Sequence, residues 1–339
     1  CAYNCPSRSC YVGISQTNQH LPSTSTCSVP AKPRLDHGHI YFDVKAFNDM
    51  GFNRFKLVPN QRSGAQDALK VFSSRRSKDR GSMTQSVSLN PVHKTVVYSY
   101  PKSGRSWLRF IVANYINRDQ DLGLPINFQS IFTLLPNDEP SALKGLENYQ
   151  FDSSQDVPLI LFSHEEKKLN SNSGAKNVVL LRSIPDVVVS DYFHRTRLLG
   201  YDEGELSQFI RSDKGVLAQY LAYINHVAKF RNDESLLLTY EALKRNPATE
   251  VSRLLSYIGL ETNQETLSQA VSDSSIENMS SLEKALGIAG HSLHLYKDPE
   301  ARRVRKGKAG GFSDYLSVKD IDYCRQQAQL VLTKDARKL

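Results

Sequence analysis

Residues 93–116 read HKTVVYSYPKSGRSWLRFIVANYI, and this stretch decides the fold. Its first part, residues 94–100, is a short run rich in β-branched and aromatic residues, which is typical of a buried strand. Its last part, residues 106–116, carries an apolar stripe at helical spacing, formed by Trp107, Leu108, Ile111, Val112 and Tyr115. Between the two parts lies a polar loop. The sequence therefore predicts a strand, a polar loop and a helix in direct succession.

The polar loop (residues 100–106) has the chemistry of an anion site. Where a parallel strand ends and a helix begins, free backbone N–H groups and the helix dipole favour negative charge. Lys102 adds a point charge, two serines add hydroxyls, and Gly104 lets the backbone approach a ligand closely. The GxxxxGK[ST] phosphate loop is absent from the chain, and here the lysine precedes the glycine. Taken alone, such a loop is better explained as an ordinary polar turn.

Strands and helices alternate along the rest of the chain. VPLILFS (157–163) and KNVVLLRS (176–183) are near-continuous apolar runs of the kind that parallel sheets contain, and SLLLTYEAL (235–243) reads as a strand that leads to a turn. Helices are predicted at residues 184–197, 204–212, 215–232 and 247–260, the first with Pro185 near its start. The alternation predicts an α/β fold in a single domain, with a central parallel sheet and helices on both faces.

The first 82 residues differ from the remainder in charge. They hold 12 Lys and Arg against 5 Asp and Glu, so +7 of the net charge of +8 lies there. The basic pI therefore gives little reason to expect nucleic-acid binding by the main domain. SSRRSKDRGSM (73–83) is polar and lacks periodicity, and Met83 opens a stretch that looks like an ordinary protein start. We expect residues 1–82 to be a weakly structured or non-native extension and residues 83–339 to form the catalytic domain.

The cysteines divide in the same way. Four of the five lie in the extension, and only Cys324 lies in the main domain, which suits a reducing compartment. No run approaches the roughly 18 apolar residues that span a membrane. Residues 1–30 also lack the apolar core of a signal peptide. We therefore expect a cytoplasmic protein without a membrane span.

Two further basic sites follow predicted elements. Arg182 ends one strand, where a guanidinium can make two hydrogen bonds to a phosphate, and Ser190 follows on the next helix. Near the C-terminus, RVRKGKAGG (303–311) is a glycine-rich basic turn, which by itself is normally a solvated loop. Three phosphate-type sites suit a ligand with two phosphate positions.

At this point a family resemblance becomes specific. YPKSGRSW, LLRSIPDVVVSDYFH and RKGKAGG occur in the order and approximate spacing of soluble, cytosolic-type sulfotransferases that use 3′-phosphoadenosine 5′-phosphosulfate (PAPS). The first resembles the family's 5′-phosphosulfate loop YPKSGTTW, the second its 3′-phosphate motif and the third its RKGxxGDW motif. TYEALKRNP (239–247) also resembles YEDLKxNP. The resemblance covers residues 92–315, and SGRSW and GGFSDYL look more bacterial or algal than animal.

The resemblance implies a P-loop-like 5′-phosphosulfate-binding loop and a transferase reaction. The enzyme would transfer a sulfuryl group from PAPS, its co-substrate, to a hydroxyl or amine of a small-molecule acceptor by in-line displacement. No metal is implied, because arginines, lysines and helix N-termini supply the charge stabilisation that phosphoryl transfer often takes from magnesium.

The resemblance also implies a role for each matching residue. The 5′-phosphosulfate end would contact Lys102, Ser103, Gly104, Arg105 and Ser106. The 3′-phosphate would contact Arg182, Ser190, Arg305, Lys306 and Gly307. The adenine would contact Trp107, Tyr240, Ser274 and Ile276, the last two from SSIENM (274–279), where the isoleucine replaces a phenylalanine that stacks on the base. The catalytic set would be His164, Lys102 and Ser190.

His164 follows a strand in LILFSHEEKK, where the family has KTH. The resemblance implies that it accepts the proton of the acceptor, for which an ordinary pKa near about 6.5 is suitable. Glu165 and Glu166 come next, and either could orient the histidine or be the base. Phe162 stands where a second lysine is common, so assistance to the leaving group is missing or comes from Arg105. Gly311 and Phe312 replace Asp and Trp of the third motif, so that loop is expected to close differently.

Two other readings stay open. A P-loop-type nucleotide-dependent kinase would share the strand–loop–helix geometry, but the Walker motif is missing. A degenerate nucleotide-binding module is argued against by the presence of both Lys102 and His164.

The sequence does not indicate which acceptor is used. The acceptor pocket should be formed by residues 118–156, 195–205 and 280–300, with Phe128, Phe132, Tyr149, Tyr201 and Tyr296. These suit an aromatic alcohol, a lipid or an amine. Other histidines, such as His194, lack ligand spacing and are expected to be surface or structural residues, and the oligomeric state is not predicted.

Overall fold

The computed structural model describes residues 88–138, 150–151, 157–169, 174–212, 215–287 and 298–339. All of them belong to the unit that spans Gly64–Leu339. The expected extension, residues 1–82, lies outside the described residues, and so do Tyr149 and Tyr296.

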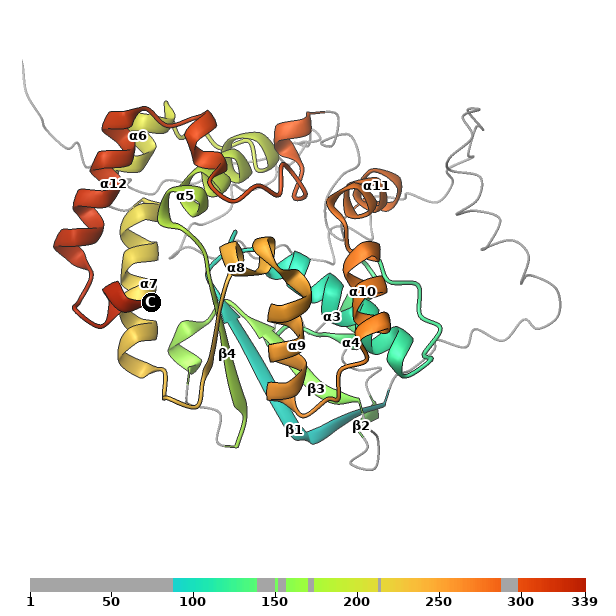
Figure 1. Cartoon of the computed structure of the whole chain (residues 1–339). Helices are drawn as coiled ribbons and strands as arrows, with labels where there is room; N and C mark the ends of the chain where they lie inside the picture. Colours follow the sequence, from blue (N-terminus) through green and yellow to red (C-terminus); the bar gives the residue numbers. More distant parts are fainter. Residues whose placement is uncertain (1–87, 139–149, 152–156, 170–173, 213–214, 288–297) are drawn as a thin grey trace, which may run out of the picture. The chain divides into compact units, whose positions relative to one another are not determined.

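A parallel sheet forms the centre of this unit (Figure 1). Strand β1 (Ser88–Ser99) pairs with β3 (Pro158–Ser163) and with β4 (Lys176–Leu181), and β4 pairs with β5 (Leu236–Thr239). The two-residue strand β2 (Gln150–Phe151) pairs with the first residues of β1. All of these pairings are parallel. Every residue of β3 and all but the first of β4 are buried, which explains their uninterrupted apolar sequence.

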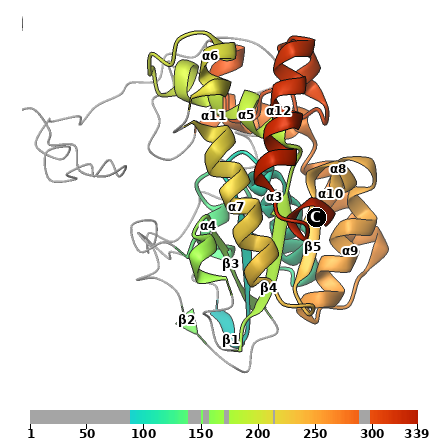
Figure 2. The same cartoon turned by 90° about the vertical axis from the view of Figure 1, so that its left-hand side faces the viewer.

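Helices cover both faces of the sheet. Helices α3 (Arg105–Asp119), α9 (Pro247–Ile258) and α10 (Gln264–Asp273) pack together, while α5 (Ile184–Phe193), α6 (Leu206–Arg211), α7 (Val216–Phe230) and α12 (Val318–Val331) form a second group. Figure 2 shows α7 and α9 on opposite sides of strands β4 and β5. The predicted α/β architecture is thus confirmed. The smaller elements are α4 (Ile131–Leu134), η3 (Glu166–Lys168), α8 (Tyr240–Arg245), α11 (Ile276–Leu286), η6 (Pro299–Ala301), η7 (Gly311–Asp314) and η8 (Ala336–Lys338).

Two local predictions need correction, one in the type of helix and one in the type of element. The helix expected over residues 184–197 leaves α-helical geometry after Phe193 and continues as a π-helical turn, His194–Leu198. There the Thr196 hydroxyl donates to the Tyr192 carbonyl at 2.8 Å, a side-chain bond that competes with the helical ladder. The turn expected after β5 is the helix α8, because the Thr239 hydroxyl accepts from the Ala242 N–H at 3.2 Å and caps its first turn.

The carboxyl ends of the strands bring the motifs together. Strands β1, β3, β4 and β5 run parallel, so the residues that follow each strand gather at one edge of the sheet. Lys102, His164, Arg182 and Tyr240 follow these four strands in that order. Within the part of the chain that the structure describes, no helix is long and apolar enough to cross a membrane.

Candidate active site

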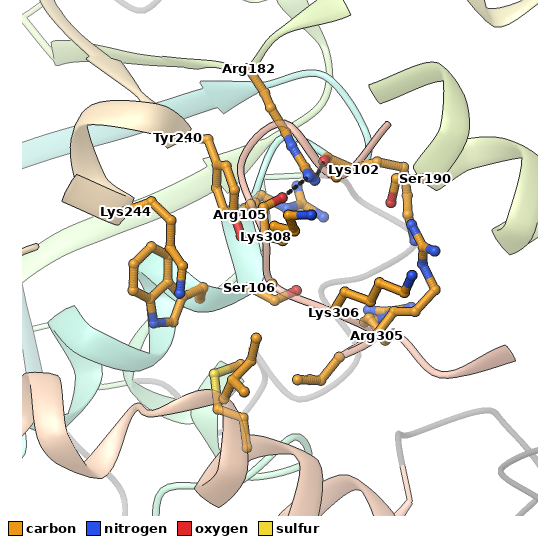
Figure 3. Close-up of a pocket in the computed structure, with 18 of the residues that line it drawn as sticks. Lys102, Arg105, Ser106, Arg182, Ser190, Tyr240, Lys244, Arg305, Lys306 and Lys308 are labelled. Carbon is orange, nitrogen blue, oxygen red and sulfur yellow. Dashed lines mark hydrogen bonds between the residues drawn. The ribbon is translucent and has the colours of Figure 1, made fainter. Parts of the chain in front are cut away.

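A cavity of about 560 Å³ opens at this edge, within the ~300–1,000 Å³ that small-molecule sites usually occupy. Thirteen of the fifteen predicted site residues line it: Lys102, Gly104, Arg105, Ser106, Trp107, His164, Arg182, Ser190, Tyr240, Ile276, Arg305, Lys306 and Gly307. Figure 3 shows Tyr240 and Lys244 at one side of the cavity and Ser190, Arg305 and Lys306 at the other, with Lys102 and Arg182 above. The cavity therefore has an aromatic end and a polar, basic end.

The polar loop begins α3 through an unusual backbone. Lys102 and Gly104 both have positive φ, 71° and 96°, and the Gly104 carbonyl accepts the first helical bonds, from Trp107 N at 3.0 Å and Leu108 N at 3.2 Å. A Cβ at Gly104 would overlap the ring of Tyr240. Glycine is therefore required by both conformation and space. The polar loop leads into the N-terminus of α3, where the helix dipole and the backbone N–H groups favour an anion.

Lys102 is a strongly perturbed group of the cavity. Burial lowers the pKa of Lys102 to about 7, and the positive charges of Arg303, Arg305 and Arg182 add to this effect, against which Asp191 acts. A cation held among other cations is stabilised by any anion that enters, so the free site is poised to bind negative charge.

Arg182 joins the two basic segments of the cavity. Its Nη1 donates to the Lys102 carbonyl at 3.1 Å, and its Nη2 donates to the Lys308 carbonyl at 3.2 Å. The guanidinium lies over the Tyr240 ring at 4.3 Å. The buried Tyr220 hydroxyl donates to the Arg182 carbonyl at 2.6 Å and accepts from its N–H at 3.0 Å, which fixes the backbone. Arg182 is thus held on several sides and points into the cavity.

The aromatic end is built around Trp107. Its indole N–H donates to the Ser274 carbonyl at 3.0 Å, its ring lies edge-to-face with Tyr240 at 5.8 Å, and the Lys244 ammonium lies 5.1 Å from the ring centre. Ile276 and Met279 of α11 line the cavity near it. This end offers flat and aliphatic surfaces to a planar group.

The basic end is a segment that we call the basic loop (residues 303–312). It carries Arg303, Arg305, Lys306 and Lys308, all of which line the cavity. Arg305 Nη1 donates to Glu300 at 2.8 Å and to the Tyr315 hydroxyl at 2.7 Å, so one edge of its guanidinium is fixed. A Cβ at Gly307, where φ is 55°, would overlap the Ile276 side chain. The basic loop thus packs directly on α11.

His164 lies where β3 ends beside β1. Its Nδ1 is 2.6 Å from the Ser99 carbonyl. Since a carbonyl only accepts, Nδ1 carries the proton of the neutral ring, and Nε2 is the basic nitrogen. Burial, followed by the charge of Arg105, lowers the pKa of His164 to about 3. The imidazole is therefore neutral at pH 7, the form that a proton acceptor needs.

Two predicted residues lie behind the cavity wall. Ser103 and Ser274 are fully buried, and neither lines the cavity. The Ser274 hydroxyl accepts from Asn114 Nδ2 at 3.0 Å, so this serine supports Trp107 from behind rather than facing a ligand.

The other candidates for the base and the acceptor pocket are also placed. Glu165 forms an ion pair with Lys168 at 2.9 Å, and neither Glu165 nor Glu166 lines the cavity. Phe162 is fully buried beneath the guanidinium of Arg109, 4.3 Å from its ring centre. Of the aromatic residues expected in the acceptor pocket, the three that the structure describes do not line the cavity. Phe128 is in the core, Phe132 lies under Arg109 and Tyr201 is exposed.

Sequence reasoning missed several residues of the cavity. Lys244, Arg303, Lys308, Asp186 and His194 line it, although His194 was expected to be a surface or structural residue. All five lie inside motifs that the sequence had already singled out, so the signal was present. His194 begins the π-helical turn after α5, which the periodicity did not predict.

A parallel α/β sheet with a strand–loop–helix anion site, a second basic segment and an aromatic end in one cavity defines a nucleotide-binding protein of the P-loop-like class. Within that class, the chain belongs to the sulfotransferase domain family, whose family model matches residues 93–335. It is therefore an enzyme that transfers a sulfuryl group, and the kinase and degenerate-module readings are not favoured.

The relatives agree with this membership. The chain is 28% identical over 233 residues to sulfotransferase 1E1 of Bos taurus, a match that covers 66% of this chain and 78% of the relative. It is 25% identical to flavonol 4′-sulfotransferase of Flaveria chlorifolia, with 65% and 72% covered. The crystal structure of mouse sulfotransferase SULT7A1 complexed with PAP matches with a TM-score of 0.51 at 17% identity, over 75% of this chain and 90% of that one. The last match concerns the fold.

Proposed function

We propose that the protein transfers the sulfuryl group of PAPS to a hydroxyl or amine of a small-molecule acceptor, with His164 as the base and Lys102 beside the leaving oxygen. The observation that carries this proposal is one cavity in which a helix-start anion loop, an aromatic end and a second basic loop meet beside a neutral histidine.

The residues of the cavity fit the nucleotide. PAPS bears charge at two positions of its ribose, on the 5′-phosphosulfate and on the 3′-phosphate, and the same ribose carries a planar base. The polar loop around Lys102 suits the first, and Arg182, Ser190 and the basic loop suit the second. Trp107, Tyr240 and Ile276 suit the base, and the close approach of Gly104 to Tyr240 leaves room only for a bare backbone.

The chemistry follows from these positions. The acceptor oxygen or nitrogen attacks sulfur and forms a new bond to it, while the bond from sulfur to the bridging phosphate oxygen breaks. His164 Nε2 takes the proton that the acceptor loses. Lys102 stabilises the charge that appears on the departing phosphate, which leaves as 3′-phosphoadenosine 5′-phosphate (PAP). Arg105 is the nearest substitute for the lysine that Phe162 replaces, since it lines the cavity and its charge acts on His164.

The acceptor class and the compartment are part of the proposal. A small hydroxylated or amino compound is supported by the name of the flavonol 4′-sulfotransferase relative. The cytoplasm is supported by the single cysteine of the main domain, Cys324, which is buried and unpaired.

The experiment is an acceptor screen with mass-spectrometric detection. The purified chain is incubated with PAPS, and in parallel with ATP, and a panel of phenols, alcohols and amines. Sulfated product with PAPS and no phosphorylated product with ATP is the expected result. Phosphoryl transfer, or PAPS that never binds, would refute the proposal.

His164→Ala should lower kcat by ~10²–10⁴ and leave PAP affinity unchanged, because the base acts on the acceptor. Glu165→Gln and Glu166→Gln are the matched controls and should keep near-normal rates. The wild-type kcat/KM should show no acid limb near pH 6.5, since the pKa of His164 in the free protein lies near about 3. A dead glutamate variant beside an active His164→Ala would assign the base to the carboxylate.

A further inference from the structure

The basic loop must hold its shape without help from regular structure. Residues 302–310 lie between η6 and η7 and form neither strand nor helix. Four cations of this loop line one cavity, and three of them form ion pairs, Arg305 with Glu300 and both Lys306 and Lys308 with Asp314. These ion pairs hold side chains and not the backbone, so the N–H groups of the loop still need acceptors.

Glu283 supplies such acceptors at the start of the basic loop. This carboxylate of α11 is fully buried, and its two oxygens accept from Arg303 N at 2.7 Å and from Val304 N at 2.8 Å. The same helix carries Ile276 and Met279, which line the cavity at its aromatic end. Glu283 therefore ties the start of the basic loop to the helix that forms part of the base site.

Asp186 does the same at the end of the basic loop. It belongs to α5, is almost fully buried, and accepts from Gly310 N at 2.8 Å and from Phe312 N at 3.0 Å. The Ser183 hydroxyl donates to it at 2.9 Å and keeps it in place. Two carboxylates from separate helices thus each take two N–H groups, one pair at either end of the same ten-residue loop.

We propose that Glu283 and Asp186 are positioning residues, which hold the basic loop in the conformation that recognises the 3′-phosphate of the nucleotide. Glu283 contacts the backbone of the loop, whereas Asp186 also lies 3.8 Å from the Arg182 guanidinium and lines the cavity. Neither carboxylate needs to touch the ligand in order to hold the loop. Because the loop is already ordered in the free protein, binding of the phosphate costs little conformational entropy, which favours affinity. The inference rests on the proposed function, since it assumes that the basic loop is the 3′-phosphate site.

The test compares two nucleotides that differ only in that phosphate. Affinities of the full chain for PAP and for adenosine 5′-phosphate are measured by calorimetry, for the wild type and for Glu283→Gln and Asp186→Asn. Each substitution turns one acceptor oxygen into a donor that opposes a backbone N–H. PAP affinity should fall roughly tenfold, and adenosine 5′-phosphate affinity less than about twofold. Hydrogen exchange of the peptide that holds residues 303 and 304 should quicken in Glu283→Gln.

Asp320→Asn is the matched control. Asp320 is a buried carboxylate that accepts from Ser207, Arg211 and Ser317 and caps α12, and it does not line the cavity. It should lower thermal stability and leave the ratio of the two affinities unchanged. If Glu283→Gln fails to fold, Asp186→Asn carries the test together with the double variant Asp186→Asn/Arg182→Ala, because Asp186 also lies 3.8 Å from Arg182.

The two possible failures are distinguishable. A wild-type protein that does not prefer PAP to adenosine 5′-phosphate would overturn the proposed function and this inference with it. A wild-type preference that survives undiminished in the folded variants would overturn the inference alone.

Discussion

The two anion-binding segments of the cavity are built in opposite ways. The polar loop lies between β1 and α3, so its shape follows from the elements on either side and from two residues with positive φ. The basic loop has no such frame, and carboxylates from α5 and α11 hold its backbone from a distance in sequence of up to 126 residues. One loop is shaped locally and the other by remote side chains.

The difference predicts how each segment responds to change. A loop shaped by its own residues should lose its conformation when those residues are substituted and should tolerate distant substitutions. A loop held by remote carboxylates should lose its conformation when those carboxylates are substituted. Arg182 belongs to both, since it donates to a carbonyl of each loop. Four predictions test how far this contrast extends.

The largest difference is expected between two glycines of the cavity, Gly104 and Gly307. Gly104→Ala combines a φ of 96° with overlap against the Tyr240 ring, which is fixed by its neighbours, and should reduce kcat/KM for PAPS at least ~100-fold. Gly307→Ala meets only the flexible Ile276 side chain and should cost about tenfold. Adding Ile276→Ala should restore part of the Gly307→Ala loss. Steady-state kinetics of both variants test this prediction. Equal losses of kcat/KM would mean that the two loops are equally rigid.

Arg182→Ala should have the second-largest effect. It should lower PAP affinity about ten- to a hundredfold, since a charge-assisted hydrogen bond to phosphate contributes ~1.5–3 kcal/mol. Adenosine 5′-phosphosulfate, which lacks the 3′-phosphate, should lose much less, and any loss measures the contact with the Lys102 carbonyl. Calorimetry with both ligands tests this. Equal losses for the two ligands would make Arg182 a purely structural link between the loops.

A smaller effect is expected from pH. In the free protein the pKa of Lys102 is about 7, and a bound anion favours the charged form, so binding above pH 7 requires uptake of a proton. PAP affinity should therefore fall between pH 7 and 9, by at most about tenfold per pH unit. Lys102→Met should remove this slope. Hydrogen bonds to Tyr315 and Asp314 raise the pKa of Lys306, so Lys306→Met should weaken binding and keep the slope. A slope that persists in Lys102→Met would assign the proton elsewhere.

The smallest effect, none, is expected from removal of residues 1–82. The break in charge and composition before Met83 predicts that residues 83–339 fold and bind PAP as the full chain does. Thermal unfolding and calorimetry on both chains check this. An insoluble or non-binding short chain would place the extension within the fold.

The contrast between the loops also explains what the sequence could predict. The strands β1, β3, β4 and β5 and the helices α3, α7 and α9 follow from short apolar runs and helical stripes, which are local patterns. The polar loop was predictable for the same reason, because its neighbours in sequence are its neighbours in space.

The rest depends on contacts that no local pattern encodes. Glu283 lies in α11 beyond SSIENM (274–279), the part of that helix that a motif covers, and its importance appears only when Arg303 and Val304 are brought beside it. Ser274 was expected to face the adenine, yet it is buried behind Trp107. The helices after residue 260 likewise carried no motif strong enough to predict them.

Trp107 is the only tryptophan of the 339-residue chain, and it stands in the cavity wall between Lys244 and the Ser274 carbonyl. All indole fluorescence of the protein therefore originates at the proposed adenine site. A base that stacks there changes the surroundings of the sole emitter, so the protein carries its own optical reporter. Fluorescence can therefore follow nucleotide titrations, stopped-flow binding rates and the comparison of every variant above without an added label. No signal from a second tryptophan has to be subtracted.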